Sequence, residues 1–87
     1  MEQELIWQNI VAHEGQIFTK ILGREFTYTV HGEAIQVVGN QPYPVSRQNI
    51  INAHAIGQVK GPGAYPDHIV GPSYVWALLH DERINVW

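Results

Sequence analysis

The segment His80-Asp81-Glu82 places an imidazole beside two carboxylates, the side chains that perform general acid–base catalysis. Adjacent residues of a helix point in different directions, however, because only residues three or four positions apart share a helix face. A histidine at a helix C-terminus also has a structural role, since its protonated form interacts favourably with the helix dipole. We therefore interpret this segment as the polar end of a core helix and assign no catalytic residue.

Other catalytic and cofactor patterns are weaker still. The five histidines include no pair at the four-residue spacing of helical zinc ligands: His13, His31, His54, His68 and His80. The chain has no cysteine, which excludes disulfides, thiolate chemistry and cysteine-based zinc sites. The segment KGPG at 60–63 lacks the spacing of a phosphate-binding loop, and Pro62 removes a backbone donor. We expect no metal and no cofactor.

The stretch SRQNIINAH, beginning at Ser46, has the composition of a recognition helix. If Ile50 and Ile51 face inward, polar side chains remain near the N-terminal end of the helix: Arg47, Gln48, Asn49 and Asn52. Arg, Gln and Asn can read base edges, and a helix N-terminus can contact phosphate. Lys20 and Arg24, on an expected hairpin, would extend this patch. These six residues are the candidate contacts to nucleic acid or to a partner.

The charge balance argues against strong binding to nucleic acid. Five basic residues face eight acidic ones, for a net charge of -3, whereas non-specific affinity for DNA requires several phosphates to be neutralised together. The element before Ser46 is a proline-broken loop, so no helix-turn-helix partner is evident. Only 15% of residues are charged, which leaves the surface weakly protected against self-association and makes a homodimer plausible.

Aromatic residues form a further candidate surface. We expect most of them to complete a small core, with Trp76 and Trp87 partly exposed. The set is Trp7, Tyr43, Tyr65, Tyr74, Trp76 and Trp87.

The predicted fold is a single α+β domain over residues 1–87, with helices packed on one face of an antiparallel sheet. Residues 2–13 predict an amphipathic helix, with Leu5 and Val11 widening its apolar stripe. Alternating patterns predict a three-stranded meander at about 16–22, 25–31 and 34–38, with a two-residue turn after His31.

The second half of the chain is expected to carry two helices. NQPYPV is interpreted as an extended connector that breaks the sheet. One helix runs from its N-cap Ser46 to Gly57, a Gly- and Pro-rich loop covers 57–71, and the last helix begins at Gly71-Pro72. Alternation at 83–86 allows a short final strand.

The segment GPSYVWALLHDERI, from Gly71, resembles the C-terminal end of small bacterial or phage proteins of uncharacterised activity. These proteins share a hydrophobic strand region followed by a GPSYVWALL-type helix, and the resemblance covers about the last two-thirds of the chain. It implies a bacterial or phage origin and an ordered domain. It implies no activity, so no functional residue is carried over.

The leading functional hypothesis is a non-enzymatic binding module that acts through a surface on another protein or on itself. The alternative is a nucleic-acid-associated module that uses the helix starting at Ser46. A third possibility is a small hydrolase that depends on His54, His68 or His80. The N-terminus lacks a secretory pattern, and no apolar run approaches the ~18 residues that span a bilayer. We therefore expect a cytoplasmic protein without a membrane partner.

Overall fold

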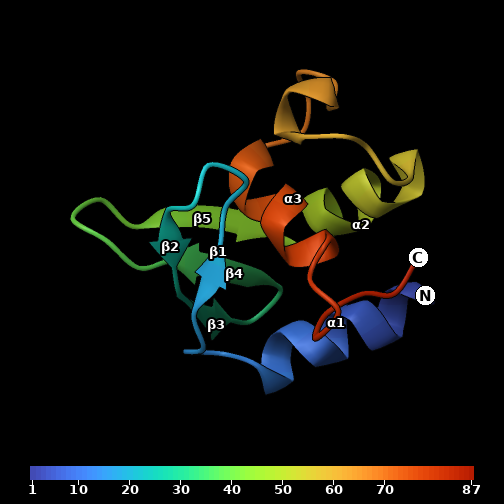
Figure 1. The fold of residues 1–87 in the computed structure, drawn as a ribbon. Helices are drawn as coiled ribbons and strands as arrows, with labels where there is room; N and C mark the ends of the chain where they lie inside the picture. Colours follow the sequence, from blue (N-terminus) through green and yellow to red (C-terminus); the bar gives the residue numbers. More distant parts are fainter.

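Three α-helices and five short strands make up the α+β fold of the computed structural model, which describes residues 1–87 (Figure 1). One sheet pairs β1 with β2, and a second sheet has the strand order β3-β4-β5, all antiparallel. The elements in chain order are α1 (Gln3–Ala12), β1 (Phe18–Thr19), β2 (Glu25–Phe26), β3 (Tyr28–His31), β4 (Ala34–Val37), β5 (Tyr43–Ser46), α2 (Arg47–Ile56), the 3-10 helix η1 (Pro62–Ala64) and α3 (Pro72–Leu79).

Local signals place the helices where the sequence predicts them. The Ser46 hydroxyl caps α2 by accepting the backbone N–H of Asn49 at 3.1 Å. Gly57 ends α2 with a φ of 101°, in the region that favours glycine. Gly71 precedes α3 with a φ of 59°, and a Cβ there would lie 3.0 Å from the Tyr43 ring. Only glycine fits this position comfortably.

The sheets differ from the expected meander. The predicted strand at 16–22 shrinks to β1, which pairs only with β2, in the register Phe18 to Phe26. The three-stranded meander begins at β3 instead, and its last strand is β5, formed by the segment expected to be a connector. The expectation that NQPYPV breaks the sheet is therefore wrong. Pro44 is accommodated because β5 is an edge strand, where proline is tolerated.

The core lies between the sheets and the helices. The apolar patterns predict nine residues inside, and seven of them are buried: Phe26, Tyr28, Ile35, Val37, Ile50, Leu78 and Leu79. The other two, Val30 and Ile51, are only half-buried. Tyr28 is fully buried and donates its hydroxyl hydrogen to the Ile10 carbonyl at 2.6 Å, so its polar atom is satisfied. The predicted widening of the α1 stripe holds only for Trp7, which is buried; for Leu5 and Val11 it is wrong, because both are exposed.

The chain beyond α3 turns back without forming the possible final strand. Asn85 is buried and donates a side-chain amide hydrogen to the Leu79 carbonyl at 3.0 Å, which fastens the turn after α3, whereas its Oδ1 has no hydrogen-bond partner. The two termini lie together (Figure 1), where the Met1 ammonium donates to the Val86 carbonyl at 3.1 Å. None of the helices combines the length and the hydropathy that crossing a membrane requires.

Candidate functional site

His80 contacts aromatic rings and no carboxylate. Its ring stacks on Trp76 with centroids 4.3 Å apart, and its Nδ1 lies 2.8 Å from the Trp76 carbonyl oxygen. Its Nε2 is buried without a hydrogen-bond partner. Asp81 bonds instead to Arg83, at 2.8 Å. The open concavity over residues 80–83 therefore presents the Asp81–Arg83 ion pair and the exposed carboxylate of Glu82.

Arg83 ties the turn after α3 to the start of β1. It donates to the Ile17 carbonyl at 3.0 Å, and its guanidinium lies 3.9 Å from the Phe18 ring centroid. Its hydrogen bonds to Asp81 lower the pKa of that carboxyl below the usual 3.8. Because the folded-state pKa is the lower one, the pair's stabilisation is present above about pH 4. It is lost as the pH falls through that folded-state value.

We expect Asp81→Asn to reduce the free energy of unfolding at neutral pH by up to about 1 kcal/mol, the range of exposed ion pairs. The difference from the parent should shrink at about pH 2, because acid protonates the parent's carboxyl as the pH falls toward and through its lowered pKa. Urea unfolding at both pH values measures this difference. Glu82→Gln, which changes the neighbouring exposed carboxylate, is the control and should leave stability unchanged at both. A deficit of Asp81→Asn that is the same at both pH values would contradict the assigned role.

The remaining histidines form no site with carboxylates. His54 stacks on Trp87 with centroids 5.2 Å apart, and His80 lies 5.5 Å from the same ring. Burial, and secondarily the N-terminal ammonium, lower the pKa of His54. The structure contains no group of three His, Asp or Glu side chains arranged to hold a metal ion. The expectation that most aromatic residues complete the core is confirmed for Trp7 and Tyr65, which are buried. Trp87 is exposed, as expected.

The first residue of the predicted patch on α2 makes its contacts within the protein. Arg47 bonds the carboxylates of Glu4 and Glu33, and its guanidinium lies 5.5 Å from the Trp7 ring centroid. Both of its carboxylate partners come from other elements, so Arg47 joins α1 and the β3–β4 turn to α2. A guanidinium held in this way is not free to meet a phosphate unless these contacts break.

The polar residues that follow Arg47 on α2 are divided between the interior and the surface. Asn49 is only 8% exposed, so the expectation of a solvent-facing Asn49 is wrong. Its amide donates to the Val70 carbonyl at 2.8 Å and accepts the Val70 N–H at 2.7 Å. Gln48 and Asn52 are exposed and bond each other at 2.9 Å, one helical turn apart.

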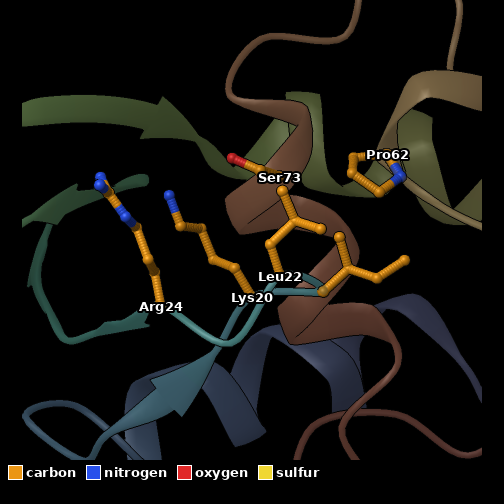
Figure 2. Close-up of a pocket in the computed structure, with 6 residues that line it drawn as sticks. Lys20, Leu22, Arg24, Pro62 and Ser73 are labelled. Atoms are coloured by element: carbon orange, nitrogen blue, oxygen red, sulfur yellow. The ribbon is translucent and has the colours of Figure 1, made fainter.

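Lys20 and Arg24 line a different hollow, between the β1–β2 turn, the start of η1 and the first turn of α3 (Figure 2). Its volume is about 200 Å³. In Figure 2 the Lys20 and Arg24 side chains extend in the same direction, and the Ser73 hydroxyl points toward them. We call this hollow the β-turn pocket; it is lined by Lys20, Ile21, Leu22, Arg24, Pro62 and Ser73.

The turn that carries this pocket is closed by its own backbone. The Lys20 N–H donates to the Arg24 carbonyl and the Gly23 N–H to the Lys20 carbonyl, each at 2.8 Å. Gly23 has a φ of 91°, which a residue with a side chain rarely adopts. Ile21 lies against Gly61, where an added Cβ would come 3.3 Å from its Cδ1. The turn is therefore ordered on both sides of Leu22.

The sequence indicated part of this pocket. The sequence predicts a hairpin that carries Lys20 and Arg24, between the strands expected at about 16–22 and 25–31, and it gives both cations as candidate contacts. Pro62 and Ser73 were missed, because a contact between segments about 40 and 50 residues apart leaves no local signal.

Comparisons with protein-family models, with curated proteins and with solved structures return no match to this chain.

Proposed function

We propose that the protein is a non-enzymatic binding module that engages a segment of another protein at the β-turn pocket. The observation that carries this proposal is Leu22, which is 93% exposed at the tip of an ordered turn and is joined in the pocket lining by the exposed Ile21. Contiguous exposed apolar surface beside a hollow marks an interaction site. The cytoplasm, the expected compartment of this chain, is the proposed setting.

Three neighbouring features support a protein segment as the ligand. Ile21 is 46% exposed, so the apolar surface extends beyond Leu22. Pro62 adds a rigid apolar wall on the other side of the pocket (Figure 2). The turn's hydrogen bonds hold this surface in one shape before binding, which reduces the entropy lost on association.

The nucleic-acid alternative has less support. It depends on α2, where Arg47 is paired with two carboxylates and Asn49 bonds the backbone of Val70. The hydrolase alternative also has less support, because His54 and His80 contact Trp87 and no carboxylate pairs with either ring.

The proposal is tested by selecting binders from a displayed library of random heptapeptides. We expect the parent to enrich a family of peptides, and Leu22→Ser to weaken their binding by about tenfold or more. Burying one leucine contributes about 1.5–3 kcal/mol, and 1.4 kcal/mol is a factor of ten in affinity. Fluorescence anisotropy with the selected peptides measures the change.

Val11→Ser provides the matched control, because Val11 is an apolar residue 45% exposed on α1, outside the pocket. The control should bind the selected peptides as the parent does. The proposal is overturned by a library that enriches no peptide on the parent, or by peptides that bind Leu22→Ser and Val11→Ser equally well.

A further inference from the structure

We infer that the β-turn pocket recognises a carboxylate that neighbours a large apolar side chain in the bound protein segment. This inference rests on the proposed function and adds the chemistry of the ligand. Its first support is the charge in the pocket. Lys20 and Arg24 both line it, and neither has a carboxylate within 4.0 Å, because the ion pairs of this protein involve only Arg47 and Arg83.

One of the two cations is held by a contact with α3. The Lys20 ammonium lies 4.8 Å from the Tyr74 ring centroid, in a cation–π contact that directs its side chain toward α3. The Lys20 N–H and the Arg24 carbonyl are joined by a backbone hydrogen bond, so the two side chains start from paired positions of one turn. A carboxylate in the pocket would meet both positive charges together.

Ser73 adds hydrogen-bonding capacity at the same place. Its hydroxyl points toward the nitrogen atoms of Lys20 and Arg24 in Figure 2. Gly71 supplies no side-chain cap to α3, and the N–H groups of Tyr74 and Val75 already bond the Gly71 carbonyl. The Ser73 hydroxyl is thus the neutral donor that the α3 end of the pocket offers to an anion.

The apolar lining of the pocket favours a ligand with one carboxylate over a polyanion. Ile21, Leu22 and Pro62 form the apolar part of the lining of a hollow of about 200 Å³, which has room for a side chain and one small anionic group. Nucleic acid gains its affinity from many phosphates, whereas this pocket offers two cations on a chain with a net charge of -3. A protein segment with an acidic residue beside an apolar one would match both the two cations and the apolar lining of the pocket.

The test uses the full chain and two probes, acetyl-Leu-Glu-Leu-amide and acetyl-Leu-Gln-Leu-amide, which differ only in charge. Backbone amide shifts of residues 20–24 and 73 report binding at the pocket. We expect the glutamate peptide to bind at least about threefold more tightly. Lys20→Gln and Arg24→Gln should each reduce this preference. Lys60→Gln should keep it, because Lys60 also lacks a carboxylate partner but does not line the pocket.

Each other outcome overturns the carboxylate inference in a recognisable way. Equal binding of the two peptides, abolished for both by Leu22→Ser, would leave the proposed function standing and remove the carboxylate. The proposed function would also stand without the carboxylate if neither probe binds but library-selected peptides change the amide shifts of residues 20–24 and 73. Inorganic phosphate or a single-stranded oligonucleotide that shifts them at lower concentration than the glutamate peptide would replace the carboxylate with a phosphate ligand. If no peptide of any source binds there, both the inference and the proposed function fail.

Discussion

Leu78→Ala is expected to lower the free energy of unfolding by about 2–5 kcal/mol, the cost of removing a buried leucine side chain and leaving a cavity. Leu78 is fully buried on α3, whose buried face packs on α2 and on β1. Domains of ordinary stability unfold with about 5–15 kcal/mol, so a loss of this size removes a large part of the total. We expect a lower urea midpoint and a lower Tm.

The matched control is Leu22→Ala, the same exchange at a residue that is 93% exposed. Surface substitutions of this kind change stability by no more than about 0.5 kcal/mol. The comparison separates the loss of packing from the exchange of leucine for alanine. If Leu78→Ala retains the parent's midpoint, α3 does not close the core.

Asn49→Ala is expected to cost about 2–3 kcal/mol. The substitution removes both hydrogen bonds to Val70 and leaves an N–H and a carbonyl of that residue without their partner. These bonds fasten the loop before α3 to α2, so the loss should appear as lower global stability and as faster amide exchange at Val70. Urea unfolding and hydrogen exchange measure the two effects.

Asn52→Ala provides the comparison on the same helix, because Asn52 is exposed and its side chain bonds only Gln48. We expect it to change stability by less than about 0.5 kcal/mol. Equal stability of Asn49→Ala and Asn52→Ala would show that the amide of Asn49 has no structural role, and would return it to the set of candidate contact residues.

The features that could be predicted from the sequence are those with short-range causes. Ser46, Gly57 and Gly71-Pro72 mark helix ends through capping and backbone conformation, which involve only neighbouring residues. The turn between β3 and β4 follows from Gly32, which has a φ of 59°. The alternation of Phe26, Tyr28 and Val30 with threonines likewise identifies the buried face of the strands.

The features that were mispredicted depend on distant partners. β5 forms because Val45 pairs with Ile35 and is buried, and this gain outweighs the prolines that suggested a connector. Asn49 is internal because the backbone at Val70 returns to it, 21 residues further along the chain. A helical pattern alone places a polar residue outside, so it cannot identify an amide that bonds the backbone of a distant loop.

The candidate site also combines features that the sequence predicts locally with features that depend on distant partners. The turn at 20–24 and its two cations are visible in the sequence, but they were grouped with α2. The structure places them instead beside Pro62 and Ser73, in a pocket separate from the one that Arg47 lines. The paired state of Arg47 and the unpaired state of Lys20 also require the fold, because the partners Glu4 and Glu33 come from other elements.

The most direct test of the account is to map the binding of a library-selected peptide by amide shifts over the whole chain. The account predicts that the largest changes fall at residues 20–24, 61–62 and 73, and that Leu22→Ser removes them. Changes concentrated at 46–52 or at 80–87, with the β-turn pocket unaffected, would contradict it.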